Sequence, residues 1–398
     1  MMKALVITPQ PFFSPRGTPF SVYYRTLITA ELGVEIDFLT YGEGQNVDIP
    51  GVRIIRIPRF AFLGDVKIGP SLPKLFLDIF MVFWTIGLLL RNHYDFVHAH
   101  EESVFFCRFL KPFFRFKLVY DMHSSLPQQL TNFQFTTSKF LIGSFKRLED
   151  TCLRAADAVI TICPDLAEYV NGLNNGSEKH LLIENSIFDQ VRTLPRSSDG
   201  NSGAPMADSE KKPLDVPPGK RLVVYAGTLE PYQGIDILIN AFKHVVAGSQ
   251  DSFLIIVGGT KEQVEDYSTL SEKCGLGTHI LFTGRVAQAL AKYYSRIASV
   301  LVSPRSEGTN TPLKIYEQLA SGIPLVATNI YSHTQVLDTD VAFLVEPDPE
   351  DMARGILAAL NPDGAGARIA ANARHLYEKK YSRPVYEQKM RALLELLS

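Results

Sequence analysis

Several residue types and motifs are scarce in this chain of 398 residues, and each scarcity excludes a class of protein. Its four cysteines, Cys107, Cys152, Cys163 and Cys274, form no CxxC pair and have no histidine partners at metal spacing. A disulfide framework or a structural zinc site is therefore not expected. The formal net charge of -2 gives no basic field for nucleic acid. The motifs GxGxxG and GxxxxGKS/T are absent, which argues against nicotinamide and P-loop sites.

Long apolar runs are scarce as well. The run Ala4 to Thr8 is too short for a signal peptide and predicts a buried parallel strand, so we expect a cytoplasmic protein with reduced thiols. The membrane-like stretch Leu75 to Leu90 has 16 residues and contains Asp78, whereas a spanning helix needs about 20 apolar residues. We interpret it as a buried helix packed on a sheet. The alternative is contact with a membrane surface, which the alternating aromatic and basic residues of 105–117 also suggest.

Short apolar strands alternate with amphipathic segments along most of the chain. In the first half the expected strands are 4–8, 35–40, 52–57, 96–100, 118–120, 158–162 and 181–183, with helices expected at 22–32 and 140–155 among others. In the second half they are 222–226, 253–257, 280–282, 300–303, 324–327 and 342–345. This alternation predicts an α/β protein with two doubly wound parallel sheets.

The composition changes sharply between the two halves. Residues 189–219 are rich in Pro, Ser, Gly and charge and have no apolar periodicity, which is typical of a linker or a disordered insertion. We therefore expect one domain over 1–188 and a second over 220–380. A last helix over 381–398 has apolar residues at helical spacing, and it could pack back on the N-terminal domain.

The most informative segment runs from Ser303 to Ala327 and reads as strand, turn, helix, strand. Its turn lies at the carboxyl end of a strand, where open α/β sheets bind ligands. A helix starting near Pro312 would direct backbone N–H groups at an anion such as phosphate. Arg305 and Lys314 add positive charge that could pair with a diphosphate. Glu307 and Glu317 could accept hydrogen bonds from sugar and ribose hydroxyls, although a solvated, ion-paired helix face would also explain these charges.

Other strand ends carry polar residues too. The loop after the first strand contains Arg16, Gly17 and Thr18, which could meet a ligand or simply form a turn. Histidines lie at or just after strand ends, at His98, His100 and His123. They could bind sugar hydroxyls, or they could simply form hydrogen bonds with neighbouring backbone groups. The loop 227–234 after the first strand of the second half is a further backbone-rich turn.

At these residues the chain resembles glycosyltransferase family 4, the retaining nucleotide-sugar transferases with the GT-B fold. The resemblance covers nearly the whole length. It rests on the Gly17 loop, the HAH segment 98–100, His123, the KRLED helix start at Lys146 before ADAVITI, Asn185, the segment 283–285 and the signature 303–322. It implies two Rossmann-like domains facing across a cleft, with the acceptor bound by the first and the donor by the second.

Two departures from the family pattern concern the diphosphate site. The spacing of nine residues between Glu307 and Glu317 is longer than usual, so Asn310 or Thr311 could replace Glu307 at the donor sugar. Thr228 and Gln233 stand where the family has Arg and Lys. We hypothesise that Arg305 and Lys314 replace those cations, which makes the chain a variant with an NTPLK-type motif.

The resemblance implies the following assignment of residues. Catalytic roles fall to His123, Arg305, Lys314 and Glu307; donor binding to Gly227, Thr228, Gln233, Glu307, Gly308, Asn310, Thr311, Pro312, Lys314 and Glu317; and the acceptor side or cleft to Arg16, Gly17, Thr18 and His100. No metal or cofactor is expected. The substrates would be a UDP or GDP sugar and a glycan, lipid-linked or small-molecule acceptor, with possible peripheral contact at the inner face of the membrane. The alternatives are a GT-B relative such as a nucleotide-sugar epimerase or phosphorylase, or a non-catalytic nucleotide-sugar-binding protein.

Overall fold

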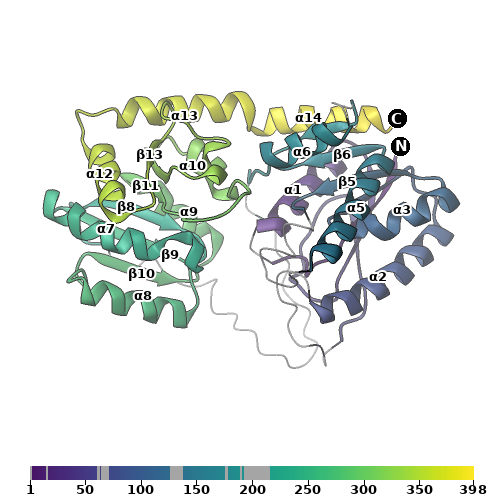
Figure 1. Ribbon diagram of the computed structural model, residues 1–398, viewed down its shortest axis with the longest axis horizontal. Coiled ribbons are helices and arrows are strands. Elements are labelled where there is room, and N and C mark those ends of the chain that lie inside the picture. The colour runs from purple at the N-terminus through teal and green to yellow at the C-terminus, as the bar shows by residue number, and fades with distance from the viewer. Residues whose placement is uncertain are drawn as a thin grey trace. The chain divides into compact units, whose positions relative to one another are not determined.

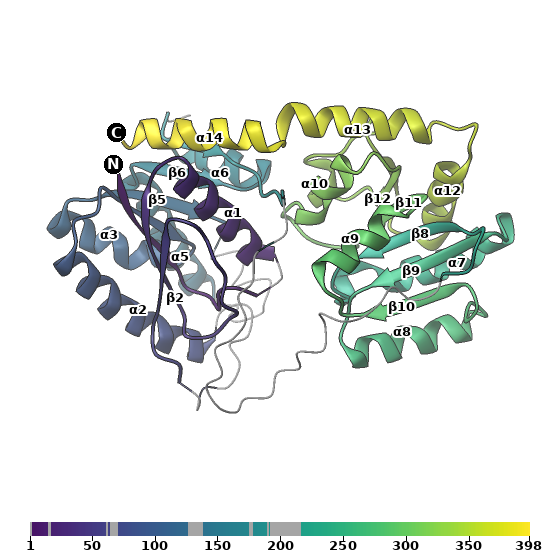
Figure 2. The same ribbon diagram turned by 180° about the vertical axis from the view of Figure 1, so that it is seen from behind.

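A computed structural model describes residues 2–14, 17–60, 63, 71–125, 138–174, 178–188, 191 and 216–398 (Figures 1 and 2). The chain divides into two compact units, Met1–Asp199 with Arg383–Ser398, and Gly200–Ser382. Each unit is built on one parallel sheet with helices on both faces. The predicted α/β class with two parallel sheets is therefore confirmed.

The first unit contains a seven-stranded sheet in the order β3-β2-β1-β4-β5-β6-β7. Its strands are β1 (Lys3–Thr8), β2 (Glu35–Thr40), β3 (Val52–Arg56), β4 (Phe96–His100), β5 (Lys117–Met122), β6 (Ala158–Thr161) and β7 (His180–Leu182). Its helices are α1 (Gly17–Glu31), α2 (Leu72–Arg91), α3 (Ser103–Phe114), α5 (Lys139–Ala155), α6 (Pro164–Asn174) and α14 (Arg383–Leu396).

Alternation along the strands sorts the side chains of the first sheet onto two faces. Leu5, Val97 and Tyr120 point into a core shared with α2, α3 and α5. Their neighbours in sequence point to the opposite face, where α1 packs against α14. Helix α1 begins five residues before the expected start, because Pro19 sits in its first turn, where a missing N–H costs no intrahelical bond.

Two sequence predictions for the helices of this unit need correction. Helix α2 is not buried as a whole: its buried side chains form only a stripe, made of Leu77, Met81, Thr85 and Leu89. Because every side of this helix is apolar, the sequence pattern could not show which side faces the core. The segment that starts at Lys146 lies in the middle of α5 and does not begin it.

The second unit contains a six-stranded sheet in the order β10-β9-β8-β11-β12-β13. Its strands are β8 (Arg221–Ala226), β9 (Ser252–Val257), β10 (Ile280–Gly284), β11 (Val300–Ser303), β12 (Leu325–Thr328) and β13 (Phe343–Val345). Its helices are the 3-10 turn η2 (Pro231–Gln233), α7 (Ile235–Gly248), α8 (Lys261–Lys273), α9 (Gln288–Arg296), α10 (Leu313–Ala320), α11 (Tyr331–Thr334), α12 (Pro349–Leu360) and α13 (Gly366–Lys380).

The buried stripe of α2 leads to a test of stability. Replacing fully buried Met81 by Ala should destabilise the first unit by about 3 kcal/mol, because it removes core contacts and leaves a cavity. Replacing Ile79 by Ala on the exposed side of the same helix should cost less than about 1 kcal/mol. Trp84 of α2 is the chain's single tryptophan, so its fluorescence during urea titration reports this unit. Equal midpoints for the two variants would contradict the packing.

Candidate functional site

Two loops that the sequence singled out meet in the second unit. Strands β8 and β11 pair in parallel, so the loops after them emerge side by side at one edge of the sheet. The backbone N–H of Ser306 donates to the carbonyl of Tyr232 at 3.0 Å. Gly234 has a φ of 67°, and a Cβ there would lie 2.0 Å from the carbonyl oxygen of Pro304. The glycine is therefore required where the two loops touch.

Arg305 and Lys314 are held in this place by aromatic rings and backbone. The guanidinium of Arg305 lies 5.2 Å from the ring centre of Tyr232, and its Nε donates to the carbonyl of Glu307 at 2.5 Å. The ammonium of Lys314 lies 4.2 Å from the ring centre of Tyr225. Neither cation forms a salt bridge with a carboxylate in the parts of the chain that the structure describes.

The lack of a counter-charge shows in the pKa values of these cations. Burial lowers the pKa of Arg305. Burial and the neighbouring Arg305 together lower the pKa of Lys314 to about 7. An anion bound beside them would reverse this shift, because an opposite charge favours the protonated form. The arrangement is therefore suited to receiving a phosphate group.

Lys314 also lies next to the position where the sequence lacks an expected cation. Its Nζ is 3.5 Å from Oε1 of Gln233, which is nearly buried. The ammonium of Lys314 thus reaches the end of the Gln233 side chain. That Lys314 replaces the missing cation stays a prediction.

The turn between Arg305 and helix α10 is shaped by one glycine and one proline. Gly308 has a φ of 131°, and a Cβ there would lie 2.1 Å from Nη2 of Arg305. The positive φ favours glycine, and a Cβ would also push the guanidinium aside. Thr311 is buried, and its Oγ1 has no hydrogen-bond partner among the described residues. Pro312 is the N-cap of α10, so this helix begins at Leu313, next to the expected position. Half-buried Asn310 lies in the same turn.

The remaining donor-side residues surround this turn. Glu317 lies on α10, 3.8 Å from the ammonium of Lys292 on α9; burial raises its pKa against the effect of that charge. The side chain of Glu307 is exposed. Gly227 and Thr228 are also exposed, and the carbonyl of Thr228 accepts from the hydroxyl of Tyr225 at 2.5 Å. A hydroxyl-rich ligand could reach both carboxylates.

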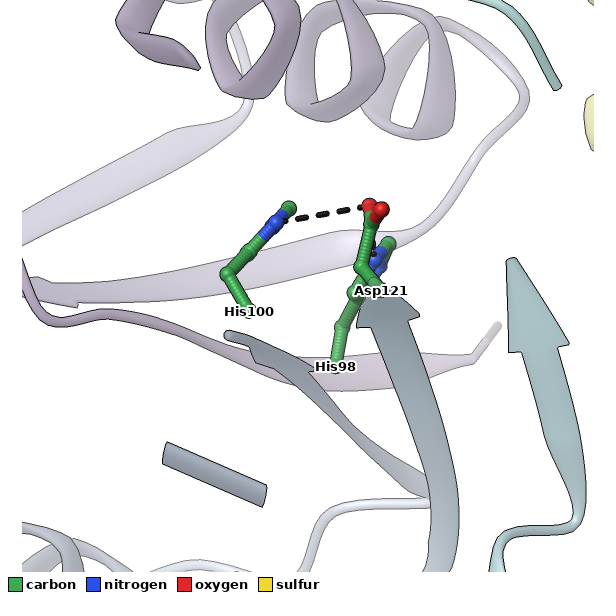
Figure 3. Close-up of side chains that lie close together, drawn as sticks. All are labelled: His98, His100 and Asp121. Atoms are coloured by element: carbon green, nitrogen blue, oxygen red, sulfur yellow. Dashed lines mark hydrogen bonds and ion pairs between the residues drawn. The ribbon is translucent and has the colours of Figure 1, made fainter. Parts of the chain in front are cut away.

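In the first unit a cluster of histidines surrounds one carboxylate (Figure 3). His98 and His100 stand on the α1 face of β4, and register places His100 opposite Asp121 of β5. His98 Nε2 lies 3.0 Å and His100 Nδ1 lies 3.3 Å from Oδ2 of Asp121. His123 Nε2 lies 3.0 Å from His100 Nδ1. The structure thus brings together the three predicted histidines.

Buried Arg25 of α1 balances the charge of this cluster. Its Nη1 donates to Asp121 Oδ1 at 3.0 Å, and its Nη2 donates to the carbonyl of Ile183 at 3.0 Å. Its Nε donates to the hydroxyl of Tyr386 at 3.1 Å. Burial raises the pKa of Asp121, but Arg25 and the histidines outweigh it and hold this pKa well below its usual value.

His100 and His123 are uncharged near neutral pH. Burial, which outweighs the opposing effect of Asp121, lowers the pKa of His123 to about 4. Burial likewise lowers the pKa of His100 well below its usual value. Neutral imidazoles can donate and accept hydrogen bonds, as binding of sugar hydroxyls requires.

The same cluster offers the atoms of a metal site. His98, His100 and Asp121 each present one ligand atom, all within 4.8 Å of one another. However, Arg25 already supplies positive charge 3.0 Å from both oxygens of that carboxylate. A divalent ion would be repelled by this guanidinium. The residues therefore fit a hydrogen-bonded ion pair better than a metal centre.

The other residues predicted for the acceptor side are only partly placed. Gly17 begins α1 and is exposed, and a Cβ there would contact nothing within 4 Å, so the backbone itself does not demand glycine. Thr18 follows it and is half-buried. Arg16 lies outside the described residues.

Sequence reasoning missed three buried polar residues. Arg25 was not recognised, although an arginine within the apolar and aromatic run 20–28 is a signal for a buried charge. Tyr386, which orients it, lies 361 residues away and left no local signal. His333 is buried beside the carboxyl end of β11, and its Nε2 lies 3.0 Å from Oγ of Ser303. This contact stabilises the start of the loop that contains Arg305.

Comparison with known proteins agrees with this architecture. Residues 206–376 match the family described as Glycosyl transferases group 1, and residues 28–186 match the Glycosyl transferase 4-like domain. A D-inositol 3-phosphate glycosyltransferase of Xylanimonas cellulosilytica is 25% identical over 369 residues, covering 87% of this chain and 83% of that protein. A phosphatidyl-myo-inositol mannosyltransferase of Mycobacterium tuberculosis is 29% identical over 185 residues, covering 45% and 47%.

A solved structure shows the same fold over the whole chain. The sucrose-phosphate synthase of Thermosynechococcus elongatus superimposes with a TM-score of 0.73 at 21% identity, covering 100% of this chain and 99% of that one. The chain is thus a glycosyltransferase with the GT-B fold, composed of a family 4-like and a group 1 domain. The alternatives of an epimerase and of a non-catalytic binding protein are not favoured by these comparisons.

The histidine cluster makes the stability of the first unit depend on pH. An unfolded histidine binds its proton near pH 6.5, whereas folded His123 binds it only near pH 4. The unfolded state therefore holds more protons between these values, and stability should fall as pH drops through this window, by about 3 kcal/mol at pH 4 for His123.

Urea titrations at several pH values, followed by Trp84 fluorescence, measure this slope. His123→Gln should flatten it, because the group that titrates has been removed. His93→Gln, a change of an exposed histidine in the same unit, should leave it as in the unchanged protein. If His123→Gln and the unchanged protein had the same slope, the proposed burial of a neutral imidazole would be wrong.

Proposed function

We propose that this protein is a retaining, metal-independent glycosyltransferase that moves a sugar from a UDP or GDP sugar to an acceptor. The observation that carries the proposal is the pair Arg305 and Lys314. Two cations are held together at the carboxyl edge of the second sheet with no described carboxylate to neutralise them. A departing nucleoside diphosphate supplies the missing negative charge.

The chemistry follows from where charge develops during transfer. As the bond between sugar and diphosphate breaks, negative charge grows on the diphosphate oxygens. Arg305 can meet them as a planar fork and Lys314 as a point charge. In many transferases a metal ion performs this task, and here two fixed side chains are proposed to perform it. This is also the proposed meaning of the NTPLK-type motif, in which Lys314 replaces the cation missing at Gln233.

The other residues are assigned by their places around this pair. Glu317 is proposed to bind the ribose, and Glu307, or Asn310 or Thr311, the donor sugar. In the first unit, neutral His123 is proposed to contact the sugar, with His100 on the acceptor side. Retention of anomeric configuration is proposed from the resemblance to family 4. Proton NMR of the first product formed from an α-linked donor would test it, and a β-linked product would contradict it.

The acceptor is proposed to be a glycan or a lipid-linked sugar. The support is the similarity to a phosphatidyl-myo-inositol mannosyltransferase, which is limited to about half of each chain. A small-molecule acceptor is equally consistent with the similarity to a D-inositol 3-phosphate glycosyltransferase. Product analysis with each class of acceptor distinguishes them.

Removing either cation should slow transfer. Lys314→Ala and Arg305→Ala should each reduce turnover about 100-fold, since each removes a preorganised charge that stabilises the transition state. Release of UDP or GDP from a panel of sugar donors, with and without acceptors, measures the rate. Lys243→Ala, at an exposed lysine of α7, is the matched control. Addition of EDTA should leave the rate unchanged. Near-normal turnover in both cation variants would refute their role.

Binding of the nucleotide should be coupled to protonation of Lys314. Because the pKa of Lys314 is about 7 without a ligand and a diphosphate would raise it, binding near pH 8 should take up a proton, and affinity should fall as pH rises above 7. Calorimetric titration with UDP and GDP in buffers of different ionisation enthalpy measures the uptake. Lys314→Met should remove this part of it, whereas Lys243→Met should not. If Lys314→Met took up as many protons on nucleotide binding as the unchanged protein, a group other than Lys314 would bind the proton.

A further inference from the structure

Large apolar side chains are exposed on one part of the first unit. Of those exposed in the parts of the chain that the structure describes, most lie on α2, α3 and α5: Leu72, Leu75, Ile79, Phe83, Leu90, Phe109, Phe113, Phe140 and Leu141. Phe113 is 79% exposed and Phe140 is 81% exposed. Soluble surfaces rarely gather so much apolar area, and such patches usually mark an interaction site.

The three helices form one continuous layer. Helix α3 packs against both α2 and α5, and all three cover the face of the first sheet opposite to α1 and the histidine cluster (Figure 1). The outer side of this layer, which we call the α2–α3–α5 face, is thus a single surface. It is separated from the candidate acceptor site by the sheet itself.

The charged residues at the carboxyl ends of these three helices are basic. Arg91 ends α2, Arg115 follows α3, and Arg154 lies in the last turn of α5. These three arginines form no salt bridge with any described residue, and Arg91, Arg115 and Arg154 are all exposed. Because the helices run antiparallel to their strands, these ends gather at the amino edge of the sheet.

The few carboxylates on these helices are engaged inside the unit. Asp78 of α2 accepts from the hydroxyl of Tyr41 at 2.6 Å. Glu149 of α5 is fully buried, and Asp150 accepts from Tyr169. Helix α3 contains no acidic residue. The α2–α3–α5 face therefore combines apolar side chains with three arginines that form no salt bridge with a described residue.

Helix α2 is long and apolar enough to cross a membrane by length and composition. Its packing argues for a different placement. Leu77, Met81 and Leu89 lie in the core of the first unit. Asp78 accepts a hydrogen bond from the hydroxyl of Tyr41, which directly follows β2. Leaving the sheet would expose that core, so α2 can lie along a membrane surface while it remains part of the folded unit.

We propose that the α2–α3–α5 face is a docking surface for an anionic lipid bilayer. Phe83, Phe109 and Phe113 would enter the interfacial region, and the arginines at the helix ends would pair with lipid phosphates. The proposal rests on the surface of the first unit alone and does not depend on the transfer reaction.

Vesicle sedimentation with the full chain tests this. The protein should bind equimolar phosphatidylglycerol and phosphatidylcholine vesicles at low salt and bind pure phosphatidylcholine vesicles far more weakly. Reversal of three charges in Arg91→Glu/Arg115→Glu/Arg154→Glu should weaken binding about 100-fold, because each basic residue near an anionic surface contributes about fivefold. The difference should shrink at about 1 M salt, where the screening length falls to about 3 Å.

The matched control reverses three charges at helix ends of the second unit. Arg296, Lys379 and Lys380 lie in the last turns of α9 and α13 and are exposed. Arg296→Glu/Lys379→Glu/Lys380→Glu changes the net charge equally and should bind like the unchanged protein. Phe83→Ser/Phe109→Ser/Phe113→Ser should weaken binding at least about tenfold at both low and high salt. Circular dichroism verifies that each variant is folded.

Three results would overturn the proposal. The first is no binding to the anionic vesicles at low salt. The second is equal weakening by the control and the α2–α3–α5 charge reversals, which would indicate net charge only. The third is self-association in sedimentation velocity that the phenylalanine substitutions abolish without changing vesicle binding, since the occupant of the face would then be a second copy of this chain.

Discussion

Parallel pairing of the strands is the constraint on which both candidate sites depend. Every pairing between the described strands of the two sheets is parallel, so all carboxyl ends of a sheet meet at one edge. That is why loops 227–234 and 304–312, far apart in the chain, touch in the second unit. It is also why register alone places His100 opposite Asp121 in the first. The topology of each sheet therefore determines the edge at which the functional side chains lie.

The two sites differ in how buried charge is balanced. In the first unit, Asp121 has a guanidinium partner in Arg25, so the charge is neutralised inside the protein. In the second unit, Arg305 and Lys314 face aromatic rings instead of described carboxylates. The pKa of Lys314 is lowered because burial and the neighbouring Arg305 disfavour its charged form. Aromatic faces hold a cation in place while leaving its charge available. The first arrangement is suited to fixing geometry, and the second to receiving an anion.

The sequence predicted strands far better than it predicted contacts. Every expected strand is present, because an apolar run bounded by polar turns is a local signal. The loop that contains Arg305 and the helix start that contains Lys314 are also identified locally. The partners of Arg305 and Lys314 could not be identified from the sequence. Tyr232 and Tyr225 contact these cations through packing of the folded chain. Gln233 reaches Lys314 only because two loops meet. Burial and charge balance are properties of the folded chain, so no spacing rule shows them in advance.

Arg25 explains why the end of the chain belongs to the first unit. A buried guanidinium has five donors to satisfy, and Asp121 and the carbonyl of Ile183 take only part of them. Tyr386 of α14 supplies the acceptor at Nε, and its ring makes a T-shaped contact with Phe188. Without the Tyr386 hydroxyl, this nitrogen would be buried and unpaired beside the histidine cluster, at a cost of about 1 to 3 kcal/mol or more. The C-terminal helix α14 therefore stabilises the ion pair of Arg25 and Asp121, and Asp121 in turn holds His98 and His100 in place.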